Sequence, residues 1–311
     1  MDLELVEKLW LQTNISPQYR HALKQACIET GSAENSLTQI PILICQANGG
    51  KKEHMLPVIT AWNILRYAAR LLDDIEDGDA KSNSVEEAIT LNVSTGFLFT
   101  VGQVLSSLES YGLDSPTASD IRQTFYKELL KICNGQHLDL IPDPPTLDEC
   151  WTISGAKSGV FVGLICWAGG RVAHANEEQL ELYRQFGYNL GLLDEIRDDL
   201  ADLWSSEKHF SDLQAKNQHY SLPITYALSV LPDEKRQTLL NYLSQPYIDE
   251  ESEELARELI IQSGAGMYLS VQSTYYYQQN LQMIADMDLP TEISDKLVNI
   301  LDKARLPTID V

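Results

Sequence analysis

Two short segments of the chain place several carboxylates among apolar residues. Both "LLDDIEDGD" and "EIRDDLAD" contain the pattern Asp-Asp-x-x-Asp. On an α-helix, carboxylates four positions apart lie one turn apart on the same face and repel each other. Each segment therefore predicts a site for a compensating cation. The candidate metal ligands are Asp73, Asp74, Asp77, Asp198, Asp199 and Asp202.

Magnesium is the cation that suits such ligands best. It takes oxygen ligands octahedrally and is commonly held by one or two carboxylates together with substrate phosphates. Two acidic helices that face each other across a bundle could hold several ions around a diphosphate, and the ions would act as Lewis acids on the leaving group. In so acidic a chain, one Asp-rich segment alone could equally be a solvated helix face. Two such segments, each following an apolar run, favour a metal–diphosphate site.

The elements that must position these carboxylates are helices. Strand signals are scarce, and the apolar residues 160–170 fit a buried helix equally well. We expect a single all-α domain over residues 1–311, with roughly a dozen helices. Helical spacing of apolar residues is found in 56–75, 84–111, 119–140, 177–204 and 251–286. Segments rich in Gly, Pro, Asn or Ser predict short loops at 48–52, 77–84, 141–149 and 221–236.

Composition limits the partners and the compartment. The chain has 23 basic and 45 acidic residues, which argues against nucleic acid or an anionic membrane surface as the main partner. The five cysteines show no CxxC spacing, which favours a reducing compartment. The N-terminal segment does not resemble a signal peptide, and no apolar stretch approaches the length of a transmembrane segment. We therefore expect a soluble cytoplasmic protein.

Further segments complete a family pattern. "NGQHLDL" contains Gln136 and Asp139, "SGAKSG" contains Lys157 and Ser158, and "HYSLPITYAL" begins at His219. Together with the two aspartate motifs, their type, order and separation resemble the trans-isoprenyl diphosphate synthases (polyprenyl synthetases) of the class I isoprenoid synthase superfamily. The resemblance is clearest over about residues 49–306. It implies a single-domain all-α bundle with a central active-site cavity, often assembled as a homodimer.

The resemblance also implies a substrate, a cofactor and residue roles. Three Mg²⁺ ions on the two motifs would bind an allylic isoprenyl diphosphate. Lys157 would contact the diphosphate, and Gln136 would lie in the cavity wall. The allylic cation formed by ionisation would be attacked by isopentenyl diphosphate or by an internal double bond. The catalytic residues implied are Asp73, Asp74, Lys157 and Asp198.

Departures from the family pattern concern the second diphosphate. Where chain-elongating members have GKRxR, "GGKKEH" keeps Lys51 but has His54 in place of the later Arg. After the first motif, the family's Arg-Arg pair is represented only by Lys81, and the Lys of GKxTLP by His219. A histidine lacks the permanent charge and the bidentate fork of arginine. Lys51, His54 and His219 therefore form a weaker candidate site for isopentenyl diphosphate.

Several functions stay open on this pattern. Prenyl transfer with an unspecified acceptor is the main prediction. The alternatives are a terpene synthase that cyclises the allylic diphosphate, a relative of the bacterial enzymes that prenylate a tryptophan in a pheromone peptide, and a non-catalytic regulatory subunit. The last is disfavoured because both aspartate motifs are intact.

Other departures affect the cavity. Glu195 stands where the family usually has Gln, and it could join the metal site, take a proton from the cation, or pair with Arg197. Ala68 and Ala69 suggest room for a long prenyl tail, although simple helix packing explains them nearly as well. Of the tyrosines at 275–277, at least one could line the cavity and stabilise a cation through its ring.

Overall fold

The computed structural model describes residues 2–30, 36–76, 84–204, 220–245 and 249–306. These residues form helices, and no strand is assigned among them. The α-helices are α1 Leu3–Gln12, α2 Pro17–Thr30, α3 Gln39–Ala47, α4 Leu56–Glu76, α5 Ser84–Leu105, α6 Ser115–Asp139, α7 Leu147–Ser154, α8 Val160–Val172, α9 Glu177–Trp204, α11 Leu222–Val230, α12 Asp233–Leu243, α13 Glu250–Gln262, α14 Ala265–Asp286 and α15 Thr291–Ala304. Short helical turns are η1 Ser36–Thr38, η2 Lys52–Met55, η3 Leu108–Tyr111 and η4 Gly155–Gly159.

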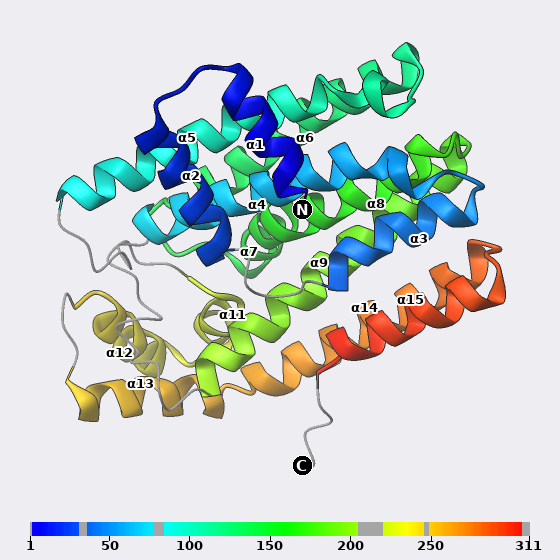
Figure 1. Ribbon diagram of the computed structural model, residues 1–311. Helices are drawn as coiled ribbons and strands as arrows, with labels where there is room; N and C mark the ends of the chain where they lie inside the picture. Colours follow the sequence, from blue (N-terminus) through cyan, green and yellow to red (C-terminus); the bar gives the residue numbers. More distant parts are fainter. Residues whose placement is uncertain (1, 31–35, 77–83, 205–219, 246–248, 307–311) are drawn as a thin grey trace.

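The two helices that carry the aspartate motifs belong to a layered bundle (Figure 1). α8 packs against α3, α6 and α9, while α4 packs against α5. α4 and α9 both run toward the side of the molecule on which α11 and α12 lie, at the left of Figure 1. Because each motif lies at the C-terminal end of its helix, the fold brings both motifs to this side of the bundle.

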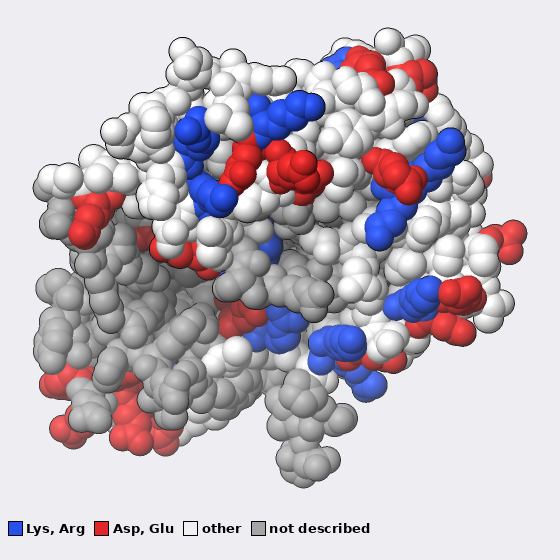
Figure 2. Space-filling view, in the orientation of Figure 1, with Lys and Arg blue, Asp and Glu red and all other residues white. Residues whose placement is uncertain are grey.

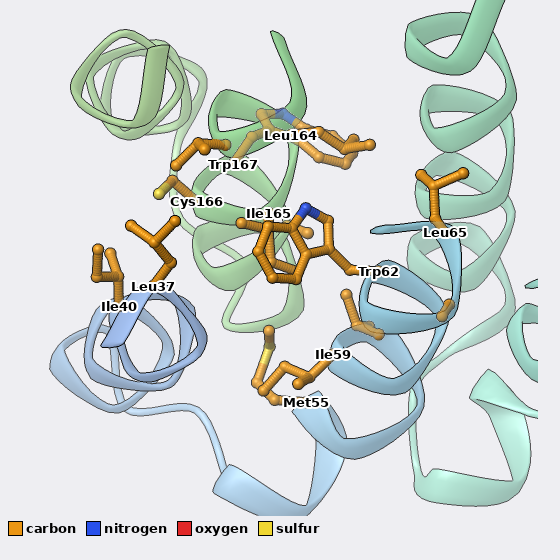
Figure 3. Packing of buried hydrophobic residues seen from close by; sticks show 14 of the residues in the cluster. Leu37, Ile40, Met55, Ile59, Trp62, Leu65, Leu164, Ile165, Cys166 and Trp167 are labelled. Carbon is orange, nitrogen blue, oxygen red and sulfur yellow. The ribbon is translucent and has the colours of Figure 1, made fainter. Parts of the chain in front are cut away.

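The core between α4 and α8 is built around Trp62. Its side chain is fully buried, its ring stacks on Phe161 at 4.8 Å between centroids, and its indole N–H donates to the Phe161 carbonyl at 3.0 Å. Figure 3 shows Trp62 pointing from α4 toward Ile165 of α8. These contacts of Trp62 hold α4 against α8. Asp73 lies about three turns further along α4 and on the same helix face as Trp62.

One prediction about element boundaries is wrong, and another is confirmed with a break. The helical spacing over 251–286 belongs to two helices, because Gly264 adopts a φ of +84° between α13 and α14. Glycine tolerates this left-handed conformation, which ends one helix before the next begins. The segment 221–236 is not a loop but contains α11 and the start of α12, separated by Leu231 and Pro232. Its prolines stand at or just before helix starts, where proline is favoured.

Two helical stretches are long and apolar enough, by length and composition, to cross a membrane: 85–105, which is 39% buried, and 147–172, which is 72% buried. The expectation that no such stretch exists is therefore not met. Core helices pass the same test, and the second stretch is mostly core. In Figure 2, basic side chains lie beside acidic ones over the upper and right parts of the described surface, whereas several acidic side chains at the lower left have no basic side chain beside them in this view.

Candidate active site

The first motif is tied to α6 through Gln136. The amide of Gln136 donates to the carboxylate of Asp73 at 3.0 Å and to that of Glu76 at 2.9 Å. Asp73 and Glu76 are three residues apart on α4 and so lie on one face. Gln136 therefore spans from α6 to this face, and it fixes the Asp73 carboxylate while leaving 46% of that side chain exposed.

Lys157 joins three elements of the site. It lies on η4, and its ammonium is 2.5 Å from Asp139 of α6 and 3.7 Å from Asp73 of α4. Burial favours the neutral amine, but the carboxylates of Asp139 and Asp73 outweigh it and raise the pKa of Lys157 above its usual value. The site thus holds a permanent positive charge beside the first motif.

The turn that carries Lys157 is a π-helix, a feature frequently found at functional sites. Its close packing against α9 requires glycine on both sides. A Cβ on Gly155 would come within 1.9 Å of the Tyr188 hydroxyl, and a Cβ on Gly191 within 2.2 Å of the Ser158 carbonyl oxygen. These approaches lock η4 onto α9 and set which residues of α9 meet Ser158.

Glu195, one turn beyond Gly191, is the residue of α9 that meets Ser158. The Ser158 hydroxyl donates a short hydrogen bond to the Glu195 carboxylate. Glu195 also contributes to the raised pKa of Lys157, after the larger effects of Asp139 and Asp73. An ion pair between Glu195 and Arg197 is one of the roles that the sequence suggests; the contacts of Glu195 described here are with Ser158 and Lys157 instead.

Arg197 pairs instead with Asp194 and with the second motif. Its guanidinium contacts the Asp194 carboxylate and lies 3.2 Å from that of Asp198. Burial raises the pKa of Asp194, and the nearby Arg197 opposes this shift. The Asp198 side chain is 70% exposed and so presents carboxylate oxygens at the surface of α9.

Asp199 has a structural contact. Its carboxylate accepts a hydrogen bond from the backbone N–H of Leu222, the first residue of α11, at 2.9 Å. Consecutive residues on a helix point about 100° apart, so Asp199 faces α11 while Asp198 faces elsewhere. The predicted role of Asp199 as a metal ligand is not tested by this contact.

The structure does not bring Lys51 or His54 beside the first motif. Lys51 caps η2, which directly precedes α4, whereas Asp73 lies near the end of α4. The 17 steps from Leu56 to Asp73 correspond to about 25 Å of helix. His54 instead faces Gly112, where a Cβ would be 3.0 Å from its imidazole Nε2. These two residues and Lys157 are therefore not neighbours.

Part of the predicted site falls outside the described residues. This holds for Asp77, Lys81 and His219, and for the side chain of Asp202. Asp74 is exposed at the end of α4. Among the residues that the structure does describe, no group of three or more His, Cys, Asp or Glu side chains is arranged to hold a metal ion. The prediction of two complete carboxylate clusters stays a prediction.

Glu76 and Ser158 are site residues to which the sequence analysis gave no role, and Asp139 was known only as part of a motif. The spacing of Gln136 and Asp139, three residues apart on one helix, was a usable signal for a shared face. The partners of that face lie on α4 and η4, far away in sequence. Of the tyrosines at 275–277, Tyr277 donates to Asp302 at 2.6 Å and Tyr276 packs on Trp151, while Tyr275 is exposed.

Comparison with known proteins shows the family. The family model described as "Polyprenyl synthetase" matches residues 35–260. A short chain isoprenyl diphosphate synthase of Methanocaldococcus jannaschii is 24% identical over 67% of this chain and 66% of its own length. The tryptophan prenyltransferase ComQ of Bacillus spizizenii is 24% identical over 75% of this chain and 80% of its own length. The chain thus spans just under two thirds of the archaeal relative.

Solved structures show the same fold. A polyprenyl synthetase from Streptomyces coelicolor superposes with a TM-score of 0.81 at 19% identity, covering 98% of this chain and 96% of the other. A polyprenyl synthase from Caulobacter crescentus, complexed with calcium and isoprenyl diphosphate, gives a TM-score of 0.80 at 19% identity, covering 97% and 94%. The chain belongs to the polyprenyl synthetase family and has the all-α isoprenoid synthase fold.

Proposed function

We propose that this protein ionises an allylic isoprenyl diphosphate with the help of Mg²⁺ and transfers the prenyl group to an acceptor. The observation that carries the proposal is the position of Lys157, whose ammonium lies between Asp73 of the first motif and Asp139 of α6. A permanent cation beside an aspartate motif suits a diphosphate that is bound partly through metal ions. The names of the family and of the relatives support the same activity.

The carboxylates that the structure describes fit Mg²⁺ in their chemistry. Asp73 and Asp198 offer hard oxygen ligands with exposed side chains, 46% and 70% respectively. The ions would be held by these two residues together with Asp74, Asp77 and Asp202, and when bound they would stabilise the charge on the departing diphosphate. Three ions are expected by resemblance.

The chain's own residues would bind the donor and keep it oriented. Lys157 would neutralise a diphosphate oxygen, and Gln136 would hold Asp73 in one orientation through its amide. Preorganised charges of this kind stabilise the leaving group without rearrangement. The fully buried Trp62, about three turns before Asp73 on α4, and the partly buried Phe161 at the start of α8 would contribute to an apolar wall that keeps water from the cation.

A panel of donors tests the proposal. Geranyl, farnesyl and geranylgeranyl diphosphate are each incubated with and without Mg²⁺, and released diphosphate is measured. We expect release that requires Mg²⁺ and that falls at least about 100-fold in Asp73→Asn. Asp120→Asn, which removes a carboxylate bonded to Arg171 at 2.5 Å outside the site, is the matched control. Release that persists in Asp73→Asn, or none from any donor, contradicts the proposal and favours a non-catalytic subunit.

The structure favours an acceptor that carries no diphosphate of its own over isopentenyl diphosphate. Lys51 and His54 precede α4, whose first residue lies about 25 Å of helix from Asp73, so they do not extend the Lys157 site into one for isopentenyl diphosphate. The relative ComQ is by name a tryptophan prenyltransferase, and we propose an indole as the second candidate acceptor. Incubation with isopentenyl diphosphate or N-acetyltryptophanamide decides between them by mass spectrometry. Cyclic hydrocarbon formed without either acceptor would instead identify a terpene synthase.

We propose further that the protein is a homodimer formed through α5 and α6. Phe99 is 74% exposed and Leu130 is 73% exposed, and large apolar side chains on one surface mark an interaction site. The other large apolar residues exposed on these two helices are Val85, Ile89, Leu91, Leu98, Tyr126 and Leu138. Light scattering should give a dimer that Phe99→Asp dissociates. Met267→Asp on α14, at a residue 66% exposed, should leave it intact. A monomeric wild type, or binding to lipid vesicles in place of dimerisation, contradicts this interface.

A further inference from the structure

The pair formed by Ser158 and Glu195 is not used by the binding roles described above. Ser158 follows Lys157 directly on η4, and its hydroxyl donates to the Glu195 carboxylate. Both side chains are partly buried. The Glu195 carboxylate therefore contacts the residue next to Lys157, the side chain that would hold the diphosphate. It lies on the side of η4 that faces α9.

The position of Glu195 is fixed by packing. Gly191, one turn earlier on α9, lies so close to the Ser158 carbonyl that no Cβ fits between them. Because residues four apart share a helix face, Glu195 meets the same turn of η4. Its nearest acidic neighbours in sequence have other contacts, since Asp194 pairs with Arg197 and Asp199 accepts from Leu222.

Prenyl transfer needs a proton acceptor. When the allylic carbon forms a bond to a carbon or nitrogen of an acceptor, the acceptor becomes positively charged and must lose a proton, either from that atom or from a carbon next to the new cationic centre. A carboxylate can take up the proton, whereas the amide that usually stands at this position in the family cannot. A positioned base typically contributes 10²–10⁴-fold to the rate of such a step.

We propose that Glu195 is the catalytic base that removes this proton. The inference rests on the proposed function. In the step, the C–O bond of the donor breaks and its electron pair leaves with the diphosphate. The acceptor's electron pair forms the new bond to the allylic carbon, and the acceptor's proton passes to the Glu195 carboxylate. If the cation reacts internally, the proton lost from carbon passes to the same group. Ser158 is a positioning residue that orients the carboxylate through its hydrogen bond.

Glu195→Gln tests the proposal with little change of shape. The amide oxygen of Gln can still accept the hydrogen bond from Ser158, but the side chain no longer takes up a proton at neutral pH. Farnesyl diphosphate, Mg²⁺ and the acceptor panel of isopentenyl diphosphate and N-acetyltryptophanamide are used, with and without each acceptor. Diphosphate release and the organic products are measured in the same reaction. Asp194→Asn, which removes a carboxylate one residue away, is the matched control.

We expect Glu195→Gln to release diphosphate at a rate within about threefold of wild type, while the product that requires proton loss falls about 100-fold or more. Farnesol formed by capture of water should replace it, because the protonated alcohol is strongly acidic and loses its proton to solvent without a catalytic base. Asp194→Asn should keep the wild-type ratio of products. A purely structural effect of the substitution would lower diphosphate release and prenyl transfer together. The two are measured separately, so this effect is distinguishable from loss of a base.

Three results would overturn the inference. In the first, Glu195→Gln keeps the wild-type product ratio. In the second, it loses diphosphate release as severely as transfer, which would make Glu195 a binding or structural residue. In the third, the wild type forms only farnesol under every condition, so that the captured water loses its proton to solvent and no catalytic base is needed. A wild type that releases no diphosphate is distinguishable from these, because it overturns the proposed function itself.

Discussion

Replacement of Lys157 by Met separates the structural role of this side chain from its chemical role. Met is similar in length but carries no charge. In the native structure the ammonium lies 2.5 Å from Asp139, whose side chain is only 8% exposed, and 3.7 Å from Asp73. The substitution therefore leaves the Asp139 carboxylate without the ammonium in a largely dry place.

The expected cost follows from this burial. Removal of one partner from a buried ion pair destabilises a protein by about 3–5 kcal/mol. Because 21% of the Lys157 side chain is exposed, solvent screens part of the interaction, and we expect Lys157→Met to lower the free energy of unfolding by about 2–3 kcal/mol. Loss of a preorganised charge at the leaving group should lower the rate of diphosphate release about 10²–10³-fold.

Urea unfolding and release of diphosphate from farnesyl diphosphate measure the two effects. The double variant Lys157→Met/Asp139→Asn also removes the negative charge of Asp139. Its free energy of unfolding should therefore exceed that of Lys157→Met by at least about 1 kcal/mol. It should not regain activity, because the cation is still missing. If the double variant recovers activity together with stability, Lys157 acts only by supporting the fold, and its assignment to the diphosphate is refuted.

Gly191→Ala should destabilise the protein by about 1–3 kcal/mol in urea unfolding, because its Cβ would lie 2.2 Å from the Ser158 carbonyl oxygen; unchanged stability would show that η4 and α9 are not locked together. Alkylation at pH 8 should label Cys133, which is exposed, well before Cys150. Burial raises the pKa of Cys150 to about 12, so its thiol stays protonated and inert below that pH. Peptide mass spectrometry checks the order, and equal labelling of both would contradict the packing of α7.

The long helices of the site could be predicted from the sequence. Apolar residues recur at helical spacings in α4, α6 and α9, and the aspartate motifs could be assigned to the ends of α4 and α9. The break at Gly264 could not, because both flanking segments continue the same apolar period. α11 was taken for a loop because its prolines and serines are also typical of turns.

Contacts between helices could not be predicted from the sequence in the same way. Periodicity shows which face of a helix is buried but not which residue of another helix it meets. The position of Lys157 between Asp139 and Asp73, and the contact of Ser158 with Glu195, depend on how η4 crosses α6 and α9. That crossing is set by close backbone approaches at glycines, which have no side chain to signal a partner.

The most direct test of the site is a crystal structure grown with Mn²⁺ and a non-hydrolysable analogue of farnesyl diphosphate, with the metal located by its anomalous signal. We predict metal ions on the carboxylates of Asp73 and Asp198 and the diphosphate beside the Lys157 ammonium. A diphosphate bound near Lys51 and His54, at the other end of α4, or metal ions bound only outside the two aspartate motifs, would contradict the account.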